Sequence, residues 1–281
     1  MFRRLSNSWE LTKASWQVLQ KDKELMIFPV IAFFASIIVM ITFAVPSFLA
    51  GLFDATVGSE IPIMGYIIGF LFYVCLYFVT IFSNSALIGA AMIRLEGGDP
   101  TVRDGLDIAM KHIGSIFGYA IISATVGMIL RFLSERAGII GRIVIGLIGF
   151  AWTVATFLVI PVLVIEGVGP MEAVQRSAGM LKKTWGEQII GNLGVGAVFG
   201  LMTFGVILVG IPIVILAAAT ESVVAIVLAI ALIILVIMAL VLVSNTLSGI
   251  YIAAVYRYAT TGEAGNYFDA SMVEGAFKPK K

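Results

Sequence analysis

The chain has 281 residues, of which 60% are hydrophobic and only 12% are charged, and its mean hydropathy is +1.06. A soluble domain of this size needs far more charged surface, so the composition predicts an integral membrane protein. The formal net charge of +1 gives no bulk attraction to nucleic acid, and we expect no nucleic-acid partner.

Cysteine and histidine are nearly absent from the sequence. Cys75 is the only cysteine and lies inside an apolar run, which excludes an intrachain disulfide and a cysteine-based metal site. His112 is the only histidine, so no histidine cluster is available for zinc or for a catalytic dyad. We therefore expect neither a metal nor a cofactor.

Apolar runs long enough to cross the roughly 30 Å hydrocarbon core of a bilayer occur six times. They cover residues 25–49, 61–93, 113–133, 139–165, 189–216 and 223–256. The first run is longer than the core of a signal peptide, so we interpret it as a retained helix. The second and sixth exceed the roughly 20 residues that suffice, and we expect them to tilt strongly or to project into the cytoplasm.

The positive charges predict the orientation. Of the 18 Lys and Arg residues, 15 lie before the first run, after the even-numbered runs or in the C-terminal region. The opposite side carries only Arg131, Arg136 and Arg142. Because cytoplasmic loops are enriched in Lys and Arg, we expect both termini in the cytoplasm. The membrane is expected to be the plasma membrane of the cell.

An amphipathic stretch precedes each odd-numbered run on the predicted cytoplasmic side. The apolar stripes comprise Leu5, Trp9, Thr12, Trp16 and Leu19 in the first, Val102, Leu106, Ala109, Ile113 and Phe117 in the second, and Val174, Ala178, Leu181 and Trp185 in the third. We expect three helices that lie at the membrane interface with their stripes in the acyl boundary.

Short strings recur along the chain. Ser83-Asn84-Ser85 resembles Ser244-Asn245-Thr246, and Glu96-Gly97 with Pro100 resembles Glu166-Gly167 with Pro170. The recurrence favours three tandem repeats of interfacial helix, span and span, over residues 1–97, 98–167 and 168–262. We therefore expect one transmembrane domain over 1–262, followed by a cytoplasmic tail over 263–281.

Three polar residues stand in or at the ends of apolar runs, and each has two interpretations. Asn84 and Asn245 either line a path for a solute or form hydrogen bonds between helices, because an amide in hydrocarbon is costly when unpaired. Glu166 follows Pro161, which can kink the fourth helix. Glu166 is either a buried carboxylate suited to proton coupling or a headgroup-level residue near Arg176.

Basic and aromatic residues of the third amphipathic stretch are candidates for contacts with lipid headgroups. They are Arg176, Lys182, Lys183 and Trp185. Basic side chains gain energy near an anionic leaflet, and tryptophan favours the interface. The competing interpretation is that this helix packs on protein, with its charges paired to a partner or to Glu166.

Several segments carry a resemblance to known proteins. Trp152, Phe157 to Gly167, Arg176-Ser177 and Trp185-Gly186-Glu187 resemble a family of prokaryotic integral membrane proteins of unknown function, as do Asn84 to Pro100 and Arg103-Asp104-Gly105. A looser version of the string from Pro161 to Gly167 occurs in the membrane domain fused to some glycerophosphodiester phosphodiesterases. The resemblance implies a helical membrane fold in a prokaryotic cell membrane and no catalytic residues.

The sequence predicts a non-enzymatic membrane protein, a scaffold or accessory subunit that engages anionic lipid or a partner through its amphipathic helices. The partner is either a second copy of the chain or another membrane protein. The alternative is a transporter or channel for a small or amphiphilic solute, with Asn84, Asn245 and Glu166 lining its path.

Overall fold

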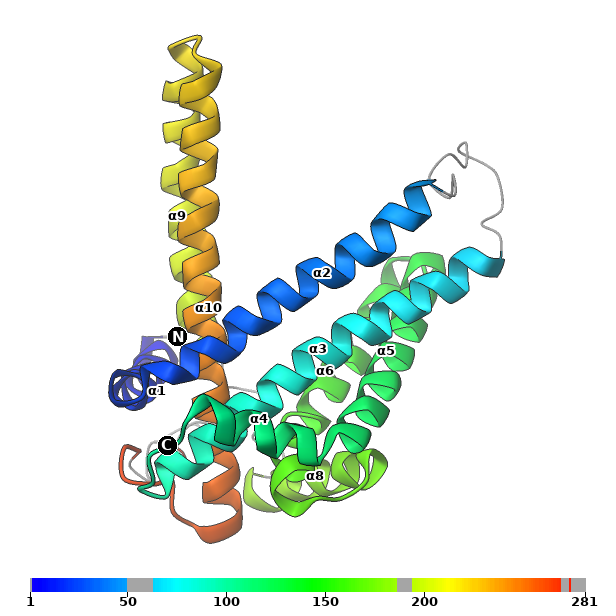
Figure 1. Cartoon of the computed structure of the whole chain (residues 1–281), viewed down its shortest axis with the longest axis vertical. Coiled ribbons are helices and arrows are strands. Elements are labelled where there is room, and N and C mark those ends of the chain that lie inside the picture. The colour runs from blue at the N-terminus through cyan, green and yellow to red at the C-terminus, as the bar shows by residue number, and fades with distance from the viewer. Residues whose placement is uncertain (1, 50–62, 186–193, 269–272, 274–281) are drawn as a thin grey trace. The chain divides into compact units, whose positions relative to one another are not determined.

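The computed structural model describes residues 2–49, 63–185, 194–268 and 273, and all regular structure among them is helical (Figure 1). In chain order the elements are α1 (Phe2–Lys21), η1 (Lys23–Met26), α2 (Ile27–Leu49), α3 (Ile63–Leu95), α4 (Val102–Lys111), α5 (Ile113–Arg136), α6 (Ile139–Ala155), α7 (Val159–Pro161), η2 (Val162–Glu166), α8 (Pro170–Trp185), α9 (Gly194–Ala219) and α10 (Val223–Thr261). The predicted all-α class is confirmed.

Six helical segments in the described part of the chain are long and apolar enough to cross a membrane. They are Lys23–Phe48, Ile63–Leu95, Ile113–Arg136, Ile139–Glu166, Val198–Ala219 and Val223–Thr261. Each corresponds to one of the six apolar runs in the sequence, although residues 61–62 of the second run and 189–193 of the fifth lie outside the described residues. These helices identify a multi-pass membrane protein.

The fourth of these segments is interrupted. Helix α6 ends at Ala155, and α7 begins only at Val159. Proline lacks an N–H, and its ring crowds the carbonyl group four residues earlier, which here belongs to Phe157. The break therefore lies one turn before Pro161, and the π-helical η2 follows it up to Glu166.

The described residues form two compact units, and each is considered by itself. The first is built from residues of Met1–Met26, Ala91–Asp99 and Trp185–Lys281, and the second from residues of Ile27–Ala90 and Pro100–Thr184.

In the first unit, α1 packs against the α9–α10 hairpin. It buries Leu11, Val18 and Leu19, whereas Trp9 and Trp16 remain 44% and 43% exposed. The stripe expected from the sequence placed Leu19 with the two tryptophans, so the structure divides that stripe between two faces of α1. The buried face faces protein, and the tryptophan face is open.

In the second unit, α4 lies close against α2 and α3. A Cβ atom on Gly105 would stand 2.5 Å from Cζ of Phe28 and 2.7 Å from the carbonyl oxygen of Ala86. A Cβ atom on Gly89 would stand 2.9 Å from Cγ2 of Ile108. Because Cβ atoms essentially never come this close to other atoms, a side chain at either position would force its neighbours to shift.

Helices α3 and α10 change character along their length. In α10 the residues from Val223 to Asn245 are exposed or half-buried, and most residues from Thr246 to Tyr256 are buried. In α3 the residues before Ile81 are mostly exposed or half-buried, and every residue from Ser85 to Met92 is buried. Each helix thus has an open first part and a protein-covered end.

Candidate functional site

The break in the fourth span creates a polar junction with α8 in the second unit. Because the helix is interrupted, the N–H of Leu158 has no regular helical acceptor and donates instead to Oγ of Ser177, at 3.0 Å. Ser177 is fully buried. A buried N–H without an acceptor is costly, so this hydrogen bond fixes α8 against the interrupted span.

The same junction holds an ion-pair cluster of three residues. Arg176 pairs with Glu166 and also with Glu172, whose Oε1 lies 2.5 Å from Nη2 of the guanidinium. The Glu166 side chain is 18% exposed, compared with 44% for Arg176 and 52% for Glu172. The hydrogen bond with Glu166, followed by that with Glu172, raises the pKa of Arg176. The sequence had offered Arg176 as a neighbour of Glu166, and the structure brings them together.

The end of η2 is closed by a glycine. Gly167 has a left-handed backbone with φ of +66°, and a Cβ atom there would stand 3.1 Å from Cε1 of His112. Burial, followed by the charge of Lys111, lowers the pKa of His112. The junction is therefore compact between η2 and the start of α5, and the neutral form of His112 is favoured.

Beyond the cluster, α8 presents two lysines. Lys182 and Lys183 are exposed, and no ion pair of either is found among the described residues. Trp185 ends α8, but its side chain lies outside the described residues. Of the four predicted headgroup contacts, Arg176 is thus occupied by carboxylates, and the two lysines are open.

The model of a family of unknown function (DUF6159) matches residues 63–267. The chain belongs to this family. No curated protein matches the chain, and no solved structure does. The DUF6159 match runs from the start of α3 to the loop after α10, and it includes the whole junction of Glu166, Arg176 and Ser177.

Within the DUF6159 match, the two asparagines stand at comparable places. Asn84 is half-buried and belongs to the second unit, whereas Asn245 is exposed and belongs to the first. Both lie where the open part of a long helix gives way to its buried end. The shared role predicted for them, a polar lining, stays a prediction.

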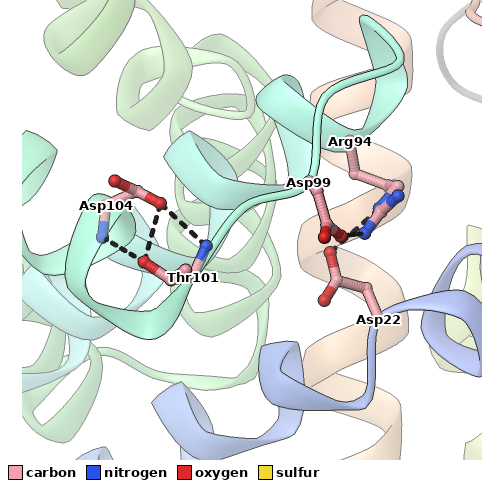
Figure 2. Close-up of polar contacts among 5 residues, drawn as sticks. All are labelled: Asp22, Arg94, Asp99, Thr101 and Asp104. Atoms are coloured by element: carbon pink, nitrogen blue, oxygen red, sulfur yellow. Dashed lines mark hydrogen bonds and ion pairs between the residues drawn. The ribbon is translucent and has the colours of Figure 1, made fainter.

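A second charged cluster, which the sequence reading did not single out, lies in the first unit. Figure 2 shows Arg94, near the end of α3, between Asp22 and Asp99. Nε of Arg94 lies 3.0 Å from Oδ2 of Asp22, and their side chains are 15% and 6% exposed. Burial raises the pKa of Asp22, and the hydrogen bond from Arg94 acts in the opposite direction. The pair fastens the end of α1 to α3.

Figure 2 also shows the start of α4, in the second unit. Thr101 and Asp104 form a capping box in which each side chain bonds to the backbone N–H of the other residue. The Thr101 hydroxyl also donates to Oδ2 of Asp104, and this hydrogen bond, followed by the one from the Thr101 N–H, lowers the pKa of Asp104. The spacing Thr-x-x-Asp was a sequence signal for this cap. Asp22 and Arg94, 72 residues apart, gave no such signal.

No group of three or more His, Cys, Asp or Glu residues is placed to hold a metal ion within the described ranges. The clusters at Arg176 and Arg94 are ion pairs, each with a central guanidinium. Their arrangement fixes helices to one another and leaves Lys182 and Lys183 as open charges on α8.

Proposed function

We propose that this DUF6159 protein is a non-enzymatic scaffold or accessory subunit of a prokaryotic cell membrane that binds anionic lipid headgroups through α8. The observation that carries the proposal is the pair of open lysines, Lys182 and Lys183, at the end of a helix whose other basic residue is neutralised. Each basic residue near an anionic leaflet gains about 1 kcal/mol. Two lysines together would therefore strengthen binding about 30-fold.

The proposed orientation puts α8 on the cytoplasmic side. It rests on the excess of Lys and Arg on the side of both termini, where the anionic surface of the inner leaflet is found. The remaining amphipathic helices share this side: α1 offers Trp9 and Trp16, and α4 offers Arg103 and Lys111. On α4, Asp104 and Asp107 offset the basic charge, so α8 should bind anionic lipid more strongly.

The side-chain burial of α8 supports this role. Ala173, Ser177 and Leu181 are buried at helical spacing, and Arg176, Lys182 and Lys183 are exposed on other faces of the helix. A helix held on one face by protein and charged on another can lie against headgroups without losing its place in the fold.

We also propose that α1, α4 and α8 begin three related repeats. The even-numbered spans end at glycines with a left-handed backbone: Gly97 at φ +91°, Gly167 at +66° and Gly262 at +78°. A glycine of this kind commonly ends a helix where the chain turns sharply. The three turns therefore support a shared construction of the proposed cytoplasmic ends.

The test is retention of phosphatidylglycerol in native mass spectrometry. We expect Lys182→Gln/Lys183→Gln to retain far less of this lipid than the parent. Arg103→Gln/Lys111→Gln, which removes the same charge from α4, serves as the matched control and should retain nearly as much as the parent. Arg176 is left unchanged because its loss would leave Glu166 and Glu172 without their cation. Equal retention by the parent and the α8 variant would exclude lipid binding through these lysines and favour a protein partner.

Transport of a solute is the alternative, and the observation in its favour is the low exposure of Glu166 beside a break in a membrane span. Because Glu166 is paired with Arg176, its carboxylate is less available to relay protons. Uptake into proteoliposomes that is lost in Asn84→Leu/Asn245→Leu would support transport over the scaffold role.

A further inference from the structure

Helix α10 carries an arginine, Arg257, two of whose donor atoms lack an acceptor in the described part of the chain. Arg257 follows the buried run of α10 that ends at Tyr256, and it stands one turn before the end of the helix at Thr261. Its Nε and Nη1 atoms are buried, and neither has a hydrogen-bond partner among the described residues. A buried donor without an acceptor is costly, and more so on a charged group.

Five of the other arginines that the structure describes have partners, and Arg142 is exposed. Those contacts join Arg94 to Asp22 and Asp99, Arg103 to Asp107, Arg131 to Glu135 and Tyr73, Arg136 to the ring of Phe132, and Arg176 to Glu166 and Glu172. Several of these side chains are well exposed and could rely on water instead. Arg257 is only half-exposed and has the greater need of an acceptor.

The end of α10 does not supply that acceptor. A cation near a helix C-terminus is usually explained by the free carbonyl groups there. Here the carbonyls of Tyr256 and Arg257 accept from the hydroxyl groups of Thr260 and Thr261, at 2.8–3.0 Å. The carbonyl of Tyr258 accepts from the N–H of Gly262, at 2.9 Å. These three carbonyls therefore do not depend on the guanidinium, and Nε and Nη1 of Arg257 find no acceptor among the described residues.

The position of Arg257 along α10 determines whether headgroups or water-soluble molecules can contact it. At 1.5 Å per residue, the open part from Val223 to Asn245 is about 33 Å long, close to the hydrocarbon thickness. Arg257 lies about 18 Å further along the helix axis. A strong tilt of α10 would bring it to the headgroups, and an upright helix would place it in the adjacent aqueous layer.

We propose that Arg257 anchors a binding site for a phosphate group at the end of α10. A guanidinium presents N–H donors in a planar fork that matches the oxygens of a phosphate, and burial strengthens such charge-assisted bonds. The residue as a whole stays partly exposed, so a phosphate can approach and accept from the fork after a rotation of the terminal torsions. The site lies on the first unit and does not depend on the lysines of α8.

The experiment measures the thermal unfolding of the full chain in detergent, with inorganic phosphate or with short-chain phosphatidylglycerol added. At equal ionic strength, chloride is the reference salt. We expect a rise in melting temperature in the parent, and about tenfold weaker binding in Arg257→Gln. Arg103→Gln, which removes an exposed arginine, should keep the parent's response to both additives. Lys182→Gln/Lys183→Gln should keep the parent's response to inorganic phosphate.

Stabilisation by both additives would assign the site to free phosphate groups, and stabilisation by the lipid alone would assign it to headgroups. A parent protein that gains no stability from either additive would overturn the proposal without reference to any variant. An undiminished gain from inorganic phosphate in Arg257→Gln would overturn it as well, and so would a lipid gain that is the same in Lys182→Gln/Lys183→Gln with and without Arg257→Gln. If Arg257→Gln does not fold, Arg257→Lys keeps the charge but loses the fork, and an unweakened response in that variant contradicts the proposal.

Discussion

The first and last parts of α10 contain similar apolar residues but have opposite surroundings. From Val223 to Asn245 no residue is buried, whereas Leu247, Ile250 and Val255 are completely buried. Helix α3 shows the same contrast on either side of Asn84. Apolar character alone therefore does not distinguish a surface that meets lipid from a surface that meets protein.

The length of the open parts explains the contrast. In α10 the open part from Val223 to Asn245 has 23 residues. In α3 the stretch from Ile63 to Asn84, which is open except at Val74, Ile81 and Ser83, has 22. At 1.5 Å per residue this is about 33 Å, which suffices to cross the hydrocarbon core. The remaining turns extend beyond it and pack with other helices. The polar strings around the two asparagines mark the change, because polar groups tolerate the membrane boundary better than its centre.

The largest effect should come from the buried end of α10. Leu247→Ala removes a completely buried side chain and should lower the free energy of unfolding by about 3 kcal/mol, from lost burial and the cavity left behind. Leu235→Ala, at a position 58% exposed on the same helix, should cost under about 1 kcal/mol, because lipid can fill the space. Unfolding of both variants in a denaturing detergent checks this, and equal losses would break the contrast.

A somewhat smaller effect is expected for the buried ion pair of the first unit. Arg94→Gln leaves Asp22 covered without its cation and should cost about 2 kcal/mol near neutral pH. Arg103→Gln, in the exposed pair with Asp107, should cost under about 0.5 kcal/mol. A thermal unfolding series of both variants measures the difference.

The stability lost in Arg94→Gln should depend on pH. Burial raises the pKa of Asp22, so its protonated form suits the fold, and stability is lost as the pH rises through this raised value. Loss of Arg94 removes the contact that offsets burial. The deficit of Arg94→Gln should therefore shrink as the pH falls into the range where Asp22 takes up a proton, and a deficit independent of pH would contradict this origin.

The smallest of the three stability effects is expected where α8 packs against the break in the fourth span. Ser177→Ala leaves the buried N–H of Leu158 without an acceptor, which should cost about 1–2 kcal/mol. Gln175→Ala, on an exposed face of α8, should change stability by under about 0.5 kcal/mol. Faster hydrogen exchange at Leu158 in Ser177→Ala alone would confirm the local cause, and equal exchange in both variants would contradict it.

Features that depend on residues close together in the sequence could be predicted, whereas contacts between residues far apart in the sequence could not. The six apolar helices follow from runs of residues, and the interruption near Pro161 follows from the chemistry of one ring. The nearness of Glu166 and Arg176 was accessible because both flank one turn. The pairing of Asp22 with Arg94 was not accessible, since it depends on how distant helices pack.

The two tryptophans of α1 illustrate a second limit. A stripe at helical spacing shows that a helix has two faces, but not which face meets protein. Leu11 and Val18 are buried while Trp9 and Trp16 stay open, because α9 and α10 cover only one side of α1. Choosing between faces requires the neighbouring helices, which the local pattern does not contain.

The central claim is that the open parts of the helices cross the membrane and that α4, α8 and the end of α10 lie on the cytoplasmic side. Single-cysteine labelling of intact cells with an impermeant maleimide, in a Cys75→Ala background, tests it most directly. Glu221→Cys, between α9 and α10, should be labelled from outside, whereas Lys111→Cys and Glu263→Cys should react only after the cells are opened. Labelling of Lys111→Cys or Glu263→Cys in sealed cells, with Glu221→Cys protected, would contradict the account.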